Sequence, residues 1–359
     1  MKKFTDFVKA NAPGVILVLS IAILSKIIYQ ILPTDSLKNM ISEVLIAIIF
    51  GFLINNIFHL PETFSPGIRF SLSKILRVGI LLMGLRLSFQ DIVSTGLTSI
   101  VLILACILLI TLITLIIIKL KLIPTKLAIL IGIGTTICGN SAIVAMSPVI
   151  DAKDEDTSFA IATITLFGII AVIMYPLIGN LLGLSDTEFG LWAGTAINDT
   201  SQVIAAGSVY SQAALDVATV VKLIRNTLMV PIIILTGLLY NLTTQKSSGK
   251  KKTRISITSI IPWFVVGFLG MTLLRTLGIS FGFFPKDVNS PNGLNEAASI
   301  LKMFNNISRF LILLALSAIG LNTKLSKIIK IGFKPLLLGL TLSLILAIFS
   351  LLAISLFIF

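Results

Sequence analysis

The sequence predicts an all-α polytopic membrane protein with about nine to eleven transmembrane helices. Of its 359 residues, 56% are hydrophobic and only 12% are charged, and the mean hydropathy is +1.06. Soluble domains are about 45–50% apolar and about 25% charged. Two glycine-rich segments interrupt the apolar runs, so we expect inverted repeats and two discontinuous or re-entrant helices that meet near the midplane of the membrane.

Apolar runs long enough to cross a membrane, about 17–25 residues, recur along the whole chain. They cover residues 14–32, 41–58, 70–88, 97–118, 127–150, 157–181, 188–213, 215–240, 257–280, 299–320 and 335–358. The run 70–88 is weaker because it contains three basic residues, Lys74, Arg77 and Arg86. The runs 127–150 and 188–213 contain the glycine motifs, and each is either a broken span or a re-entrant hairpin.

The net charge of +13 reflects membrane orientation and not nucleic-acid binding. Basic residues gather in short loops that fall on one side when the spans alternate, which identifies that side as the cytoplasm. They also lack the interleaved aromatic residues of a nucleic-acid surface. The basic positions are Lys2, Lys3, Lys9, Lys119, Lys121, Lys126, Lys246, Lys250, Lys251, Lys252, Arg254, Lys324, Lys327, Lys330 and Lys334. We therefore expect a multi-pass protein of the cell membrane with its N-terminus in the cytoplasm.

The first glycine motif, residues 134–145, breaks an apolar run with small and polar side chains. It is not a P-loop, because Asn140 stands where the lysine before the serine is required. A helix break within the membrane exposes amides that attract anions and carbonyls that attract cations. Close helix packing by small residues is the alternative. The candidate ligands here are Thr135, Thr136, Cys138, Gly139, Asn140 and Ser141.

The second glycine motif, residues 194–205, repeats the first one sixty positions later and adds a carboxylate. An acidic side chain inside an apolar segment is costly and marks an ion or proton pathway. A short surface loop is the alternative position for Asp199. The candidate ligands of this motif are Asn198, Asp199, Thr200, Ser201 and Gln202.

Two cations follow in the next apolar run, with Asn226 beside them. Lys222 and Arg225 are three residues apart and therefore share one face of a helix. They could pair with Asp199 or with an anionic substrate. Secondary polar candidates in other runs are Arg77, Asn305, Asn306 and Arg309.

The domain boundary is expected at the basic loop 242–256, which separates an N-terminal helix set, 1–241, from a C-terminal set, 257–359, in one membrane body. A second internal sequence repeat relates Gly84–Leu97 to Gly320–Phe333 at a constant offset. The predicted topology places these copies at opposite faces, as in inverted repeats. The two glycine motifs would be parallel as broken spans but inverted as re-entrant hairpins.

Neither a catalytic site nor a metal or cofactor site is expected. The chain has one histidine, His59, and two cysteines, Cys106 and Cys138, and the cysteines lie inside separate apolar runs. These positions form no zinc or disulfide pattern. We therefore predict that the protein is not an enzyme.

The motifs resemble the YeiH-type family of bacterial inner-membrane proteins, which are often labelled sulfate exporters. The resemblance rests on residues 137–143, 198–207, 222–231 and 318–321, and it covers most of the chain from about residue 40 onward. It implies a transporter with inverted repeats and discontinuous helices, and a homodimer by analogy with the wider fold group. Members commonly carry histidine where this chain has Asn198, which would leave Asp199 as the titrating group.

These observations predict a secondary active transporter that exports a small inorganic or sulfur-containing anion, coupled to protons or cations. A monovalent cation/proton antiporter is the alternative within transport, with Asp199 as the cation ligand. A membrane scaffold or receptor that moves no solute is the alternative from another class. The expected partners are the lipid bilayer, a small anion or cation and a possible second copy of the chain, but no nucleic acid.

Overall fold

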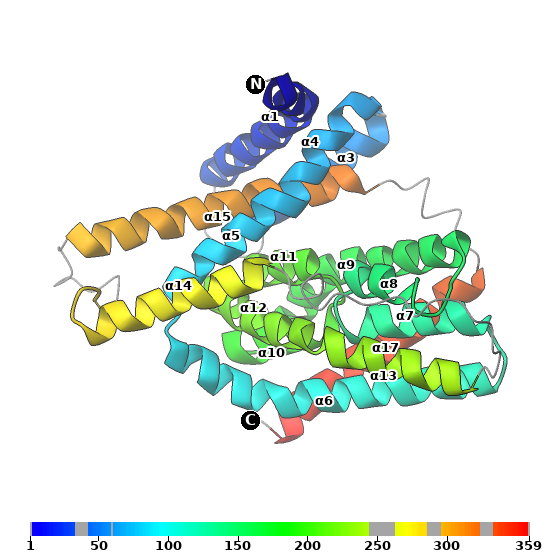
Figure 1. The fold of residues 1–359 in the computed structure, drawn as a ribbon. Helices are drawn as coiled ribbons and strands as arrows, with labels where there is room; N and C mark the ends of the chain where they lie inside the picture. The colour runs from blue at the N-terminus through cyan, green and yellow to red at the C-terminus, as the bar shows by residue number, and fades with distance from the viewer. Residues whose placement is uncertain are drawn as a thin grey trace. The chain divides into compact units, whose positions relative to one another are not determined.

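The computed structural model describes residues 2–32, 42–58, 60–243, 263–285, 296–323 and 333–357 (Figure 1). Every regular element in these ranges is helical, which confirms the predicted all-α fold class. Residues 244–256 of the expected linker and residues 324–332 of the second internal repeat lie outside the described ranges.

Seven helical segments of the described chain are long and apolar enough to cross a membrane. They are Asp6–Ile31, Ser99–Lys119, Asp154–Leu181, Gln212–Tyr240, Trp263–Ser280, Ala297–Asn322 and Phe333–Leu356. This finding confirms a polytopic membrane protein.

The number of long spans is smaller than the nine to eleven crossings expected, because four apolar runs do not form single long helices. The run 41–58 forms α3 (Glu43–Phe58), which has only 16 residues. The run 70–88 is divided among several short segments. The two glycine runs, 127–150 and 188–213, are each interrupted at their motif.

The helices group into two compact units, and the chain passes between them more than once. Unit 1 comprises Met1–Val93 and Pro262–Leu325, and unit 2 comprises Ser94–Ile261 and Ser326–Phe359. This division does not coincide with the boundary expected at 242–256. Both glycine motifs and the last helix, α17 (Phe333–Phe357), belong to unit 2.

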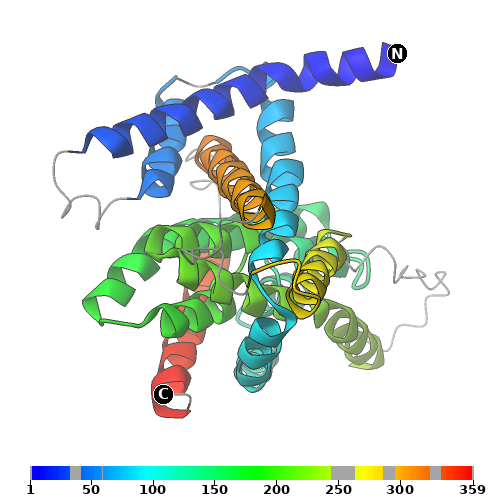
Figure 2. The same ribbon diagram turned by 90° about the vertical axis from the view of Figure 1, so that its left-hand side faces the viewer.

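Unit 1 is built around α15, which lies against α3 and α5 (Figure 1 and Figure 2). Its helices are α1 (Lys2–Ile31), α3, α4 (Ser65–Phe70), α5 (Leu76–Met83), α14 (Trp263–Ser280) and α15 (Glu296–Asn322), with the 3-10 turns Glu62–Phe64 and Gly84–Arg86 and the π-helical turn Ser71–Ile75. The backbones of α3 and α15 cross closely at Gly51 and Gly320. A Cβ atom on Gly320 would stand 2.2 Å from the Ile48 carbonyl oxygen, so only glycine fits this crossing.

Unit 2 contains both interrupted segments and the helices that hold them. Its elements are α6 (Phe89–Lys119, mostly in this unit), α7 (Thr125–Thr136), α8 (Asn140–Met146), α9 (Asp154–Leu181), α10 (Asp186–Ala196), α11 (Thr200–Tyr210), α12 (Gln212–Thr227), α13 (Met229–Thr243) and α17. Its apolar core includes buried side chains from α7, α9, α10, α12 and α17. The interrupted segments are therefore held inside a packed helical framework.

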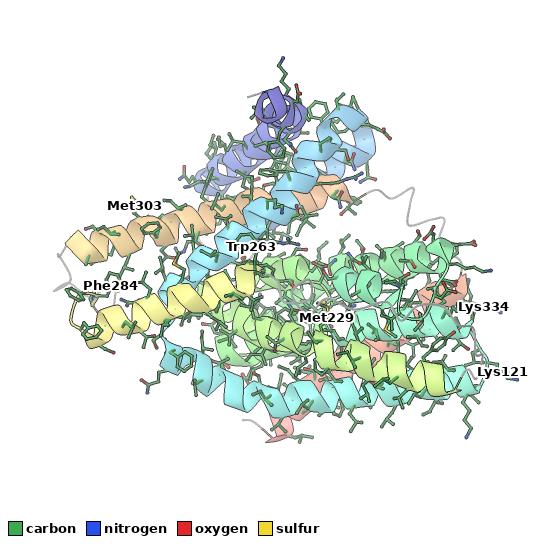
Figure 3. All side chains as sticks on the ribbon, in the orientation of Figure 1. Lys121, Met229, Trp263, Phe284, Met303 and Lys334 are labelled. Carbon is green, nitrogen blue, oxygen red and sulfur yellow. The ribbon has the colours of Figure 1, made fainter. Side chains whose placement is uncertain are left out.

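Basic side chains gather at one end of unit 2. Lys121 follows α6, Lys334 lies at the start of α17, and Figure 3 shows both at the same end of these helices. Two further lysines, Lys119 and Lys126, lie next to the connection between α6 and α7. The predicted grouping of the 119–126 cations with Lys334 is therefore observed within this unit.

Candidate functional site

The first glycine motif forms a re-entrant hairpin, called hairpin 1, from α7 and α8. The side-chain amine of Lys126, at the start of α7, donates a hydrogen bond to the carbonyl of Asp151, which follows α8. The two ends of the segment therefore lie together on one side. At the tip, Gly139 has φ +64° and ψ −123°, a conformation that side chains with a Cβ atom rarely adopt.

The second motif forms hairpin 2 from α10 and α11. Its ends also meet, because the hydroxyl of Ser211 donates to the Asp186 carboxylate at 2.6 Å and the Tyr210 hydroxyl donates to the Leu184 carbonyl. A capping box of Ser185 and Glu188 begins α10. Hydrogen bonds from the Ser185 hydroxyl and backbone N–H lower the pKa of the exposed Glu188 carboxyl.

The two hairpins break at equivalent positions. Helix α7 ends at Thr136 and α10 ends at Ala196, while α8 begins at Asn140 and α11 begins at Thr200. Each pair is separated by the same sixty positions that relate the two sequence motifs. The repeat seen in the sequence is therefore a repeat of backbone geometry.

The hairpins start from opposite ends of the long helix α9. The last residues of hairpin 1 lead into the start of α9 at Asp154, and the end of α9 at Leu181 leads into hairpin 2. With 28 residues and about 1.5 Å per residue, α9 separates these ends by about 40 Å. Of the two arrangements left open by the sequence, the structure has the inverted hairpins and not the parallel spans.

Both tips contact the middle of α9 at Thr165. The Asn140 amide donates to the Thr165 hydroxyl at 3.2 Å, and the Gln202 amide donates to the Thr165 carbonyl at 3.2 Å. Gly168 makes room for Gln202, since a Cβ atom there would stand 1.8 Å from the Gln202 Oε1 atom. The tips also meet each other, because a Cβ on Gly139 would lie 3.4 Å from the Cα of Asp199.

Lys222 of α12 holds the backbone of both tips. Its wholly buried amine donates to the carbonyls of Ile137 at 2.9 Å, of Ile197 at 3.0 Å and of Asn198. Ile137 and Ile197 are equivalent positions of the two hairpins. One ammonium group thus satisfies carbonyls that the ends of α7 and α10 leave without helical partners.

Arg225, one turn further along α12, repeats this pattern with its guanidinium group. It donates to the carbonyls of Thr136 at 2.6 Å and of Thr135 in hairpin 1. In hairpin 2 it donates to the carbonyls of Thr195 at 2.6 Å and of Ile197 at 3.2 Å. Arg225 is also buried. Cations are stabilised at helix C-termini, so both side chains complement the ends of α7 and α10.

The sequence left two possible partners for these cations, Asp199 and an anionic substrate. Their hydrogen bonds in the structure do not go to Asp199. Lys222 and Arg225 bind backbone carbonyls, and the Asp199 carboxylate accepts from the Ser201 amide at 2.9 Å and the Ser201 hydroxyl at 2.6 Å. Two helix ends together carry about one negative charge, so the two side chains leave positive potential beneath the tips.

Asp199 is the N-cap of α11. Gln202 completes a capping box by accepting from the Asp199 backbone N–H at 3.3 Å. Asp199 is half-buried. The equivalent residue of hairpin 1 is Gly139, which has no side chain to cap α8.

A polar patch surrounds Asp199 where α8 and α11 begin. Asn140, Thr200 and Ser201 are half-buried and Ser141 is exposed. The Asn226 amide of α12 donates to the Thr200 hydroxyl at 3.2 Å, and its own Oδ1 has no partner among the described residues. We refer to Asn140, Ser141, Asp199, Thr200 and Ser201 as the tip patch.

Other sequence candidates are placed differently from expectation. The hydroxyls of Thr135 and Thr136 donate to carbonyls of their own helix, Ile131 at 2.9 Å and Gly132 at 2.7 Å, so these two residues contribute backbone carbonyls and not hydroxyl ligands. Buried Cys138 packs its sulfur 3.4 Å from that of Met229. The Asn198 side chain is buried on the side of the tip that faces α17.

The secondary candidates all belong to unit 1. The Arg77 guanidinium lies 5.7 Å from the centre of the Phe264 ring, a cation–π geometry that favours a structural role. On α15, Asn306 and Arg309 are exposed and Asn305 is half-buried. The structure therefore does not group these four with the other candidate residues within one unit.

Thr165 and Gly168 are site residues that the sequence did not indicate. Each is a common residue type in an apolar helix, and neither lies in a repeated motif. Their importance depends on contacts with segments 25 to 37 positions away, as the Asn140 and Gln202 hydrogen bonds show.

Two inverted hairpins meeting over buried cations define the class, an all-α polytopic membrane protein with paired re-entrant segments. The chain belongs to the family described as "Conserved hypothetical protein 698", which matches residues 13–339. No solved structure matches the chain.

Several relatives of the chain are named as membrane proteins. A UPF0324 membrane protein of Clostridium tetani is 33% identical over 96% of both chains. A UPF0324 membrane protein of Streptococcus agalactiae is 36% identical over 92% of this chain and 93% of its own. Another from Fusobacterium nucleatum is 37% identical over 82% and 84%, respectively.

Proposed function

We propose that the protein is a secondary active transporter that exports a small inorganic or sulfur-containing anion at the tip patch, coupled to protons or cations. The observation that carries this proposal is the meeting of two inverted hairpins at the middle of α9, which has the length of a membrane span. In such an arrangement, each hairpin separates the tips from one face of the membrane, which suits alternating access.

The electrostatics of the tips support an anion as the substrate. Lys222 and Arg225 leave positive potential because the carbonyl ends of α7 and α10 offset only about half of their charge. Asn140, Ser141 and Thr200 offer hydrogen-bond donors at the tip patch. Asp199 belongs to the same tip patch and is our proposed site of coupling to protons or cations, because its negative charge opposes the binding of an anion there.

The test is sulfate flux into proteoliposomes under an imposed pH gradient. Asp199→Asn removes the carboxylate charge but keeps an oxygen that accepts from the Ser201 amide, so we expect a folded protein whose flux has lost its pH dependence. Asp151→Asn, an exposed acid at the base of hairpin 1, is the matched control. Unchanged pH dependence in Asp199→Asn would remove Asp199 from the mechanism.

A monovalent cation/proton antiporter remains the second candidate, because a hydroxyl oxygen lies beside the Asp199 carboxylate. The Ser201 hydroxyl lies 2.6 Å from it, and carboxylate and hydroxyl oxygens are ligands for hard cations. Sodium-dependent proton release in the same proteoliposomes, without sulfate flux, would favour this function over anion export.

The proposed location is the cell membrane, with the N-terminus and the base of hairpin 1 on the cytoplasmic side. The lysines at 119–126 and Lys334 support this orientation, because cytoplasmic loops are enriched in cations. A homodimer remains part of the proposal, and cross-linking of the purified protein in membranes tests it.

A further inference from the structure

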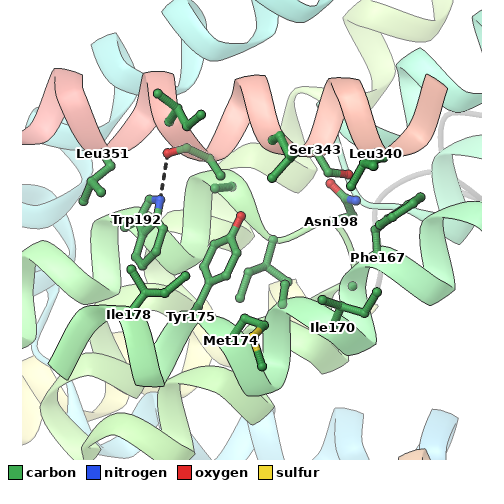
Figure 4. Close-up of a pocket in the computed structure, with 17 residues that line it drawn as sticks. Phe167, Ile170, Met174, Tyr175, Ile178, Trp192, Asn198, Leu340, Ser343 and Leu351 are labelled. Atoms are coloured by element: carbon green, nitrogen blue, oxygen red, sulfur yellow. Dashed lines mark hydrogen bonds between the residues drawn. The ribbon is translucent and has the colours of Figure 1, made fainter. Parts of the chain in front are cut away.

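A groove along unit 2 reaches from the tip of hairpin 2 to the far end of α9. Helices α9 and α17 form its walls and the end of α10 forms its floor (Figure 4). Its volume is about 320 Å³. Along α9 it extends from Phe167 to Ile178, which corresponds to about 16 Å of helix. These dimensions suit a single medium-length acyl chain.

The groove is apolar over most of its length. Ala171, Met174 and Ile178 line it from α9, and Leu344 and Ile348 line it from α17. Met174, Ile178, Leu344 and Ile348 are also exposed side chains of helices long enough to span a membrane. The groove is therefore open along helices that have the composition of lipid-facing spans.

One end of the groove is polar and lacks hydrogen-bond partners. Asn198 is 2% exposed and lines the groove at the hairpin tip, and its Oδ1 atom has no partner among the described residues. The hydroxyl oxygen of Ser343, on the facing wall, is also buried without a described partner. Buried polar groups are usually satisfied, so this pair indicates a polar ligand group.

The charge beneath this end favours an anionic ligand group. The Lys222 amine binds the Asn198 carbonyl, and Arg225 binds the neighbouring Ile197 carbonyl. Rotation of the Asn198 amide about its broad terminal torsion can present its N–H donors to the groove. The Ser343 hydroxyl can donate as well. The groove thus combines an apolar channel with donors and positive potential at one end.

We infer that this groove binds a single-chain amphiphilic anion, such as an alkyl carboxylate, with its head at Asn198 and Ser343 and its chain between α9 and α17. The inference does not depend on transport, because it concerns the side of hairpin 2 that faces α17. The ligand acts there as a binding partner that fixes the tip of hairpin 2.

Trp192 makes this binding directly measurable. It lines the groove and donates to the Ala347 carbonyl at 2.9 Å, and the chain has only one other tryptophan, Trp263. In the full-length Trp263→Phe protein in lipid nanodiscs, the fluorescence of Trp192 is measured while ω-bromododecanoate is added. We expect saturable quenching that dodecanoate displaces and dodecanol does not.

Two groove variants and one control complete the test. Asn198→Ala should weaken binding about tenfold, the value of one hydrogen bond to a charged group. Ser343→Leu should weaken it similarly, whereas Ser355→Leu, on an exposed position of α17 outside the groove, should not. Ser343→Leu keeps the test valid if Asn198→Ala does not fold.

Two outcomes would overturn the inference. Quenching that rises linearly with the probe, and equally in both groove variants, would mean partitioning into the lipid. Saturable quenching that dodecanol displaces as well as dodecanoate would exclude the anionic head. The quenching of Trp192 is measured independently of sulfate flux. Failure of this binding site and failure of the proposed transport are therefore distinguishable.

Discussion

At the scale of single residues, the two tips differ in chemistry at the equivalent positions Gly139 and Asp199. Gly139 supplies a backbone conformation with φ +64°, and Asp199 supplies a carboxylate that caps α11. Hairpin 1 thus contributes amides and neutral side chains, and hairpin 2 contributes the titratable charge. Hairpin 2 is therefore the hairpin that brings a carboxylate to the tips.

Gly168 leaves room for the Gln202 side chain. Gln202 in turn accepts a hydrogen bond from the backbone N–H of Asp199, the N-cap residue of α11. Gly168→Ala would force the Gln202 side chain out of its place, because the new Cβ atom would stand 1.8 Å from Oε1. We expect a loss of about 1 kcal/mol in the free energy of unfolding, the value of a helix cap, and a much larger loss of sulfate flux. Thermal unfolding and proteoliposome flux check the two parts.

Gly270→Ala is the control for this change. Nothing lies within 4 Å of the added Cβ atom on α14, and alanine is favoured over glycine in a helix. Its stability and flux should match or exceed those of the wild type. If Gly168→Ala behaves like Gly270→Ala, Gln202 has no positioning role.

The sequence predicted part of this residue-scale arrangement. Repeated spacing identified Asn140, Ser141, Asp199 and Gln202, which do gather at the tips. It did not predict that Lys222 and Arg225 bind carbonyls, because a carbonyl is present at every position and leaves no mark in the sequence. Thr165 was missed for a related reason, since its own carbonyl accepts one of the two hydrogen bonds.

At the scale of elements, α12 fixes both hairpins through equivalent backbone atoms. Arg225 binds the carbonyls of Thr135 and Thr195, and Lys222 binds those of Ile137 and Ile197. A helix end left without partners inside a protein is strongly destabilising. The two cations therefore hold the tips together as one structural piece.

Replacing either cation with methionine tests this role. Lys222→Met or Arg225→Met leaves several buried carbonyls unpaired, at about 1–3 kcal/mol for each group. We expect either variant to lower the thermal unfolding midpoint markedly, with a larger effect for Arg225→Met because it loses four hydrogen bonds.

Lys153→Met, an exposed lysine before α9, serves as the comparison and should unfold like the wild type. Retained stability of Lys222→Met together with a loss of sulfate flux would contradict the structural role and would assign Lys222 to the substrate instead.

At the scale of the whole molecule, the fold class predicted from the sequence was correct. The hairpin geometry could not be derived from the sequence. Two hairpins or two spans leave the remaining topology unchanged, so the charge pattern of the loops does not distinguish them. The distinction depends on contacts at the hairpin bases, between Lys126 and Asp151 and between Asp186 and Ser211. The two compact units were also not apparent, because each is built from separate stretches of the chain.

The measurement that tests the central claim most directly is the accessibility of the two hairpin bases from each side of the membrane. Single cysteines are introduced at Glu155 and Thr187, both exposed, after Cys106 and Cys138 have been replaced with alanine. An impermeant thiol reagent is then applied to sealed vesicles of known orientation. Inverted hairpins predict that Glu155→Cys reacts only from the cytoplasmic side and Thr187→Cys only from the opposite side. Labelling of Glu155→Cys only from the opposite side and of Thr187→Cys only from the cytoplasmic side, which is the result expected for two parallel broken spans, would contradict the inverted arrangement.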